Sequence, residues 1–147
     1  MEWGYFFGLL GVSLCVLLCG VGSAMGLKKT GQAAAGILSE DPKKFSKALV
    51  LVVLPATQGI YGFVFGIIAM SSCAAGMTVA QGLQVFFASL PLAIVGLISA
   101  KHQGSTAASC IHAVAKKESL SGKLILFPAM VETYAILALV ISLLLIA

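Results

Sequence analysis

The sequence predicts an all-α membrane protein in which four transmembrane helices form two duplicated helical hairpins. Three observations indicate this fold class. The 147 residues are 60% hydrophobic and only 10% charged, a composition outside the range of ordinary soluble domains. Four apolar runs are each long enough to cross a hydrocarbon core of about 30 Å, and the second half of the chain repeats the first. The runs cover residues 3–27, 48–70, 79–100 and 124–147.

The first run is interpreted as a spanning helix rather than a signal peptide, because the chain begins Met1-Glu2-Trp3 and has no basic residue before the run. Small residues recur along it at helical spacing, which lets helix backbones approach closely in lipid. Cys15 and Cys19 belong to this stripe, so their spacing favours packing over a metal site or a disulfide. The stripe consists of Gly4, Gly8, Gly11, Cys15, Cys19, Gly22 and Gly26.

Helix starts are predicted for the other three runs. Asp41-Pro42 can cap and begin the second helix, and Ser121 can do the same for the fourth. Thr78 with Gln81 fits a capping box at the start of the third helix, which carries a second stripe of small residues. This stripe consists of Ser89, Ala93, Gly96, Ala100, Gly104 and Ala107.

All nine lysines lie in two connectors, whereas the N-terminus, the 71–78 turn and the C-terminus have none. The positive-inside bias therefore predicts that both basic connectors are cytoplasmic and both termini lie outside. The first and third helices are expected to run past the bilayer, to about Leu38 and Ala115, where a soluble partner can bind. The net charge of +4 reflects this anchoring and does not indicate nucleic-acid binding. The lysines are Lys28, Lys29, Lys43, Lys44, Lys47, Lys101, Lys116, Lys117 and Lys123.

An offset of 73 residues places the first half of the chain on the second, which predicts two hairpin repeats, residues 1–73 and 74–147. Internal repeats of this kind are common in membrane transport proteins. At this offset Gly59 of the first repeat faces Glu132 of the second, so only the second repeat carries a carboxylate at this position. The other matched pairs include Gly31 with Gly104, Lys43-Lys44 with Lys116-Lys117, Pro55 with Pro128, and Tyr61 with Tyr134.

Glu132 lies inside an apolar run, and other polar side chains are predicted at its depth. Gln103 and Glu132 are equally distant from the turn at 117–118, which places each about 22 Å from that turn at 1.5 Å per residue. The repeat places Thr57 and Gln58 within two residues of the same level, and Tyr61 follows Thr57 by one turn. A dehydrated hard cation requires several oxygen ligands of this kind, so this cluster predicts a bound cation.

Other interpretations of these residues remain open. Glu132 can be a protonated acid with a structural hydrogen bond, although intramembrane acids are usually functional. The polar residues near it can simply bond helix to helix. Pro55 and Pro128 loosen the carbonyls of Leu51 and Leu124, and these either bind the cation or mark a packing kink.

Lys28 and Lys101 are repeat equivalents that fall close to the depth of the acid. They either snorkel or face a space that is not lipid, and Lys101 can form a salt bridge with Glu132. His102 and His112 have no companion ligands at metal spacing and are assigned no role.

Five segments resemble the membrane rotor proteolipid of V-type ATPases, also called subunit K or c, and above all its sodium-translocating bacterial form. They are "GVGSAMG", "TGQAAAG", "LPATQGIYGF", "QGLQVFFASLPLAIVGL" and "MVETYAILALVISLLL". The resemblance implies a ring of many copies, with the first and third helices inside and the second and fourth outside. It implies that Na+ is held by the Leu54 carbonyl and the side chains of Thr57, Gln58, Gln103 and Glu132, with Tyr61 hydrogen-bonded to the acid.

The resemblance further implies a non-catalytic subunit of a rotary ATPase in the bacterial plasma membrane. Its expected partners are lipid, other copies in the ring, a stator subunit with an essential arginine, and central-stalk subunits at the cytoplasmic connectors. The resemblance implies that ATP hydrolysis in a separate soluble sector turns the ring. This chain is not expected to bind the nucleotide, because its glycine-rich segment "GVGSAMG" lies inside a spanning helix and is not a phosphate-binding loop. Three alternatives are an H+-carrying rotor, a small four-helix drug/proton antiporter, and a purely structural or fusion-pore proteolipid.

Overall fold

The computed structural model describes residues 3–147, and the acidic start Met1-Glu2 that argues against a signal peptide lies outside them. The described chain contains helices and turns but no strand, and it contains four segments long and apolar enough to span a membrane, which confirms the predicted class. The elements are α1 Trp3–Glu40, η1 Pro42–Lys44, α2 Phe45–Val53, η2 Leu54–Ala56, α3 Thr57–Ser71, α4 Val79–Lys116, η3 Glu118–Leu120, α5 Ser121–Leu124 and α6 Leu126–Ile146.

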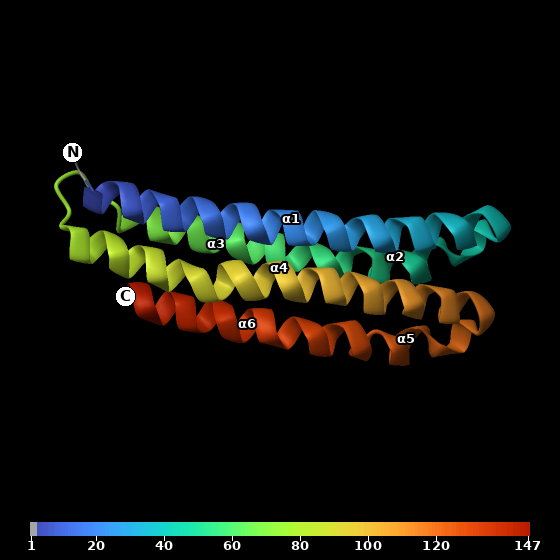
Figure 1. Cartoon of the computed structure of the whole chain (residues 1–147). Coiled ribbons are helices and arrows are strands. Elements are labelled where there is room, and N and C mark those ends of the chain that lie inside the picture. Colours follow the sequence, from blue (N-terminus) through green and yellow to red (C-terminus); the bar gives the residue numbers. More distant parts are fainter. Residues whose placement is uncertain (1–2) are drawn as a thin grey trace.

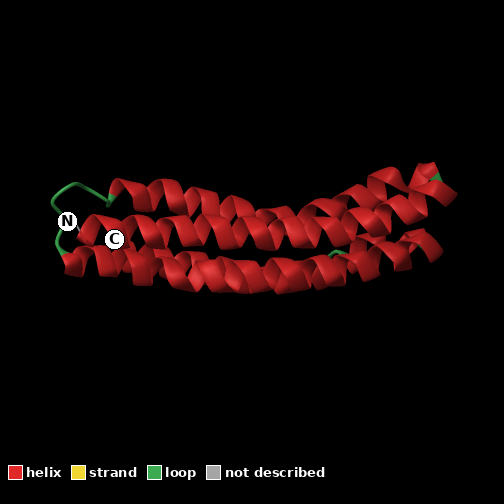
Figure 2. Cartoon of the chain, turned by 45° about the horizontal axis from the view of Figure 1, so that its top comes forward, coloured by secondary structure: helices red, strands yellow, loops and turns green. Residues whose placement is uncertain are grey.

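The four spanning segments form a long bundle with both termini at one end (Figure 1). Helices α1 and α4 run in parallel at its centre and share the most extensive contact. Helices α2 and α3 fold back along α1, whereas α5 and α6 fold back along α4. Figure 2 shows that loops are confined to the ends apart from one short interruption. Helices α1 and α4 end at Glu40 and Lys116, within two residues of the predicted positions.

The small-residue stripes lie where α1 meets α4. A Cβ atom on Gly22 would lie 2.7 Å from the Cα of Leu97, and one on Gly11 would lie 2.5 Å from the Cα of Phe86. Cys15 and Cys19 are fully buried free thiols, and the Cys19 side chain packs against Gly62 and Gly96. The stripes therefore allow backbone-to-backbone contact between the two central helices.

Replacing Gly22 by alanine is expected to lower stability by about 1–3 kcal/mol, because the new methyl group meets backbone atoms of α4 that cannot move aside. Gly36→Ala is the matched control, since nothing lies within 4 Å of a Cβ at that α1 position. Thermal unfolding of the two purified variants in detergent measures the difference. Equal melting temperatures would contradict the close contact.

Two of the three predicted helix caps are present. The Asp41 carboxylate accepts a hydrogen bond from the backbone N–H of Lys43 at 3.1 Å, and Thr78 with Gln81 forms a complete capping box. The Ser121 prediction is wrong, because the chain already becomes helical at Glu118, in η3. Ser121 has helical dihedral angles and its N–H bonds to the Glu118 carbonyl, so its side chain has no helix start to cap.

Prolines interrupt both outer segments at matching places. Around Pro55 the helix tightens into η2, and before Pro128 it is interrupted at Ile125. Side chains of the central helices reach carbonyls near these breaks. Thr30 donates to the Val52 carbonyl at 3.0 Å, and the Cys110 thiol donates to the Leu124 carbonyl at 3.5 Å. The Leu124 carbonyl thus has a protein partner, which favours the packing kink over cation binding, the two alternatives left open by the sequence.

Each basic connector joins the two antiparallel segments of one hairpin, at the end opposite the termini. The Lys47 ammonium forms an ion pair with Glu118, and the Lys44 ammonium donates to the Ala115 carbonyl at 2.9 Å while lying 3.6 Å from Asp41. The first connector is therefore bonded to the last turn of α4 and to η3.

Candidate functional site

A polar cluster lies in the middle of the bundle, where α3, α4 and α6 meet. Gln58 of α3 and Gln103 of α4 are both fully buried, and Glu132 of α6 is partly buried beside them. Burying an amide without a hydrogen-bond partner costs several kcal/mol, so the arrangement of these side chains is tightly constrained. All buried polar side-chain atoms of the described residues have a partner.

Gln103 connects the two hairpins. Its Nε2 donates to the carbonyl of Pro128 at 3.0 Å and to Oε2 of Glu132 at 3.3 Å. Its Oε1 accepts from Nε2 of Gln58 at 2.7 Å. On the other side of the acid, the hydroxyl of Tyr61 donates to Oε1 of Glu132 at 2.6 Å. Both carboxylate oxygens are therefore held by neutral donors.

The start of α3 supplies the remaining oxygens. The Thr57 hydroxyl donates to the Leu54 carbonyl at 3.0 Å and lies 3.3 Å from Oε1 of Gln58. The Leu54 carbonyl belongs to η2, the short turn around Pro55 that precedes α3. The structure thus brings all six predicted site residues into one hydrogen-bonded network: Leu54, Thr57, Gln58, Tyr61, Gln103 and Glu132.

Glu132 has no salt bridge with Lys101. The ion pairs of the described residues lie only at the connectors, and Lys101 is exposed. The reason is helical geometry, because Lys101 and Gln103 are two residues apart and so project about 200° apart around α4. The network accordingly combines one carboxylate with carbonyl, hydroxyl and amide oxygens, the ligand chemistry of a hard cation.

Comparison with known proteins identifies the family. The family model that describes the C subunit of ATP synthase matches the chain twice, at residues 10–69 and 86–145. The chain belongs to this family. The two matches fall one in each half, as expected for duplicated hairpins, whereas the boundary between residues 73 and 74 stays a prediction.

Three relatives are similar to this chain over nearly its whole length. This chain is 46% identical over 97% of its length to the V-type sodium ATPase subunit K of Enterococcus hirae, covering 92% of that protein. It is 38% identical over 94% of its length to the A-type ATP synthase subunit K of Methanocaldococcus jannaschii, covering 60% of it. It is 25% identical over 98% to the 16 kDa proteolipid of the V-type proton ATPase of Rattus norvegicus, covering 93%. These matches confirm the predicted resemblance to rotor proteolipids.

Two further residues of this proteolipid form hydrogen bonds at or next to the network, and neither was predicted to do so. The Pro128 carbonyl orients the Gln103 amide, and Thr30, which is fully buried, holds the backbone just before η2. Thr30 was detectable from the sequence as the repeat equivalent of Gln103, whereas no residue pattern points to the Pro128 carbonyl as the partner of the Gln103 amide. Their spacing indicates that each central helix donates to a backbone carbonyl of its outer partner.

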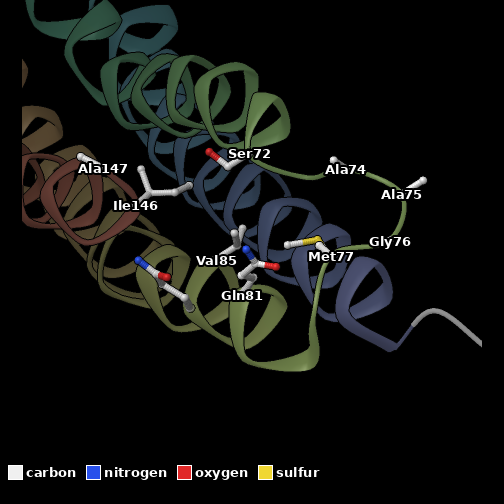
Figure 3. Close-up of a pocket in the computed structure, with 10 residues that line it drawn as sticks. Ser72, Ala74, Ala75, Gly76, Met77, Gln81, Val85, Ile146 and Ala147 are labelled. Carbon is white, nitrogen blue, oxygen red and sulfur yellow. The ribbon is translucent and has the colours of Figure 1, made fainter.

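A cavity of the proteolipid lies away from this network. It has a volume of about 460 Å³ and opens between the α3–α4 turn and the end of α6, with Ser72, Met77 and Gln81 on its wall (Figure 3). Its lining residue Gln84 precedes Gln103 by 19 residues, or about 29 Å along α4. The polar network therefore does not line this cavity.

Proposed function

We propose that this chain is the ion-translocating rotor-ring subunit of the membrane sector of a V-type ATPase, and that it carries Na+ at Glu132. The hairpins 1–73 and 74–147 form one unit of a ring of identical copies. The basic connectors face the cytoplasm and contact central-stalk subunits, and both termini lie outside a bacterial plasma membrane. The chain has no catalytic chemistry of its own.

One observation carries the proposal: a single carboxylate, bonded only to neutral donors, lies among oxygen atoms in the apolar part of the bundle. An unpaired buried carboxylate costs several kcal/mol, so a small cation in this place cancels its charge. The Na+ ligands are the Leu54 carbonyl and the side chains of Thr57, Gln58, Gln103 and Glu132, while Tyr61 fixes the carboxylate. The name of the Enterococcus hirae relative supports Na+ as the ion.

The mechanism follows from this neutralisation. With Na+ bound, the site is electrically neutral and can face lipid as the ring turns. At the stator, an arginine displaces the ion and stabilises the free carboxylate. Moving one charge across 100 mV requires about 2.3 kcal/mol, which ATP hydrolysis in the soluble sector supplies.

The second candidate function is a rotor subunit that carries H+ in place of Na+, as the name of the Rattus norvegicus relative suggests. Protonation of Glu132 alone would neutralise the site, so the other oxygens would only bond helix to helix.

Carbodiimide labelling separates the two ions. Carbodiimides react with Glu132 in its protonated, metal-free form, so Na+ is expected to protect the wild-type protein in a concentration-dependent manner. The same measurement on Gln103→Ala tests whether the amide contributes to protection. Labelling that is insensitive to Na+, together with ATP hydrolysis that does not require Na+, would favour the H+ rotor. Electron microscopy of the detergent-extracted protein tests the rotor itself, since a compact dimer in place of a closed ring would favour an antiporter.

Thr30→Val is expected to raise the Na+ concentration for half-protection about threefold to tenfold. The hydroxyl donates to the Val52 carbonyl and so fixes the backbone that presents the Leu54 carbonyl, and losing such a bond costs about 0.5–1.5 kcal/mol. Thr30→Ser keeps the hydroxyl and is expected to restore the wild-type value. Equal protection curves for the valine and serine variants would show that Thr30 only packs.

A further inference from the structure

Two hydroxyl groups of α1 bond to the backbone of the neighbouring outer segment, one on each side of η2. The Thr30 hydroxyl donates to the Val52 carbonyl at 3.0 Å. The Ser23 hydroxyl accepts from the backbone N–H of Gly59 at 2.8 Å. Both side chains are buried, and the two bonds enclose residues 53–58. This enclosed segment supplies three of the proposed ion ligands, namely the Leu54 carbonyl and the side chains of Thr57 and Gln58.

The two bonds belong to a single antiparallel register. Ser23 and Thr30 are seven residues apart on α1, and Val52 and Gly59 are seven residues apart on the outer segment. Seven residues make about two helical turns and about 10 Å, so both hydroxyls project from the same face of α1. They therefore hold the enclosed segment at both of its ends, and this pair of bonds is called the α1 clamp below.

The bond between Ser23 and Gly59 is closely packed. A Cβ atom on Gly59 would lie 3.1 Å from Oγ of Ser23, so a larger residue at this position would have to displace the hydroxyl. Gly59 lies in the first turn of α3, which has no side-chain cap of its own. A capping residue accepts a hydrogen bond from an N–H of the first turn, and Ser23 does this from α1. The start of α3 is thereby joined to a central helix.

This clamp belongs to the first repeat. At the offset of 73 residues, Ser23 corresponds to Gly96 and Gly59 corresponds to Glu132. Gly96 has no side chain with which to bond α6 at that level. Near the acid, α4 bonds to α6 through the amide of Gln103. The site therefore combines a ligand segment that is fixed at both ends with a carboxylate on a less constrained helix.

We propose that the α1 clamp sets the ion selectivity of the site, with Ser23 and Thr30 as positioning residues. The inference rests on the proposed function, in which the Leu54 carbonyl, Thr57 and Gln58 are Na+ ligands. A cage whose ligands are held at fixed spacing cannot widen to fit a larger cation, whereas a flexible cage can. The clamp thus favours Na+ over the larger K+ by fixing the spacing of these three ligands, although neither hydroxyl contacts the ion.

The test measures carbodiimide labelling of Glu132 in detergent-extracted rings over a range of Na+ and of K+ concentrations. The readout is the K+ concentration for half-protection divided by the Na+ concentration for half-protection. Ser23→Ala is expected to lower this ratio about threefold to tenfold, the effect of one lost hydrogen bond. The reason is that Na+ loses its fitted cage, while K+ binding changes less. Thr30→Val breaks the other bond of the clamp and should shift the ratio in the same direction.

Ser99→Ala is the matched control. Ser99 and Ser23 are both 6% exposed, and Ser99 lies one turn before Gln103 on α4. Its hydroxyl donates to the Gly96 carbonyl of its own helix, so its removal leaves the bonds between helices intact and should preserve the wild-type ratio. Electron microscopy verifies ring closure for each variant. If Ser23→Ala does not form closed rings, the ratio of Thr30→Val decides the inference.

A structural role for Ser23 predicts a different result. Ser23→Ala would then raise the half-protection concentrations of Na+ and K+ by the same factor, and this unchanged ratio would overturn the inference. Na+ protection of the wild type together with an unchanged ratio contradicts only the clamp. Wild-type labelling that is insensitive to Na+ contradicts the proposed function and this inference together.

Discussion

Glu132→Gln is expected to abolish Na+ transport and to leave ATP hydrolysis insensitive to Na+. Glutamine has nearly the same shape and still accepts the hydrogen bond of Tyr61, so the bundle should fold and the ring should assemble. The cage then has no negative charge to bind a cation. Removing one partner of a buried charge pair costs about 3–5 kcal/mol, which corresponds to a loss of Na+ affinity of about 100-fold to 4,000-fold.

The measurement is Na+ uptake or extrusion by vesicles that contain the assembled ATPase, with bound Na+ counted on the isolated ring. Glu40→Gln is the matched control, since Glu40 is an exposed carboxylate at the end of α1. This substitution should leave both the Na+ transport rate and the number of bound Na+ ions unchanged. Transport by the Glu132→Gln protein at the wild-type rate would exclude the ion-site role and favour a structural proteolipid.

Gln103→Ala is expected to raise the Na+ dissociation constant about 10-fold to 100-fold while leaving transport at saturating Na+ closer to normal. The substitution removes a proposed ligand and also leaves the buried amide of Gln58 and the Pro128 carbonyl without their partner. An unsatisfied buried group costs about 1–3 kcal/mol, so part of the effect will appear as lower thermal stability.

Equilibrium Na+ binding and thermal unfolding, measured on the same preparation, separate the two contributions. Gln84→Ala removes a glutamine of the same helix whose amide bonds to the Leu145 carbonyl at the far end of the bundle, and it should not change Na+ binding. If Gln103→Ala lowers stability but leaves Na+ binding unchanged, the amide only bonds helix to helix.

Much of the fold could be predicted because its determinants are local or repeated. Apolar length defines the four spans, and the capping chemistry of Asp41 and of Thr78 with Gln81 acts on the next few residues. The prediction that Ser121 caps a helix was wrong because its outcome depends on the backbone of the preceding residues. A serine is a cap only where the backbone is still extended, and no local signal shows that the turn at Glu118 starts the helix first.

The site could be predicted in part. Counting residues from the turn of each hairpin gives the depth of a residue along the bundle, and this count placed Gln103, Glu132 and Thr57 at one level. It does not give the direction of a side chain around the helix, so the salt bridge with Lys101 stayed open until the structure placed Lys101 on the exposed side of α4. The orientation of the Gln103 amide also depends on a backbone carbonyl of another helix, Pro128, which no residue pattern encodes.

The bonds between the connectors have a mechanical consequence. Lys47 with Glu118, and Lys44 with the Ala115 carbonyl, tie the two hairpins together at their tips, while the glycine-lined contact of α1 with α4 joins them along their length. A torque applied to either tip is therefore shared by both hairpins, including the one that has no carboxylate at the level of Glu132. In the proposed rotor, these contacts allow the first hairpin to pass torque to the second, which carries Glu132.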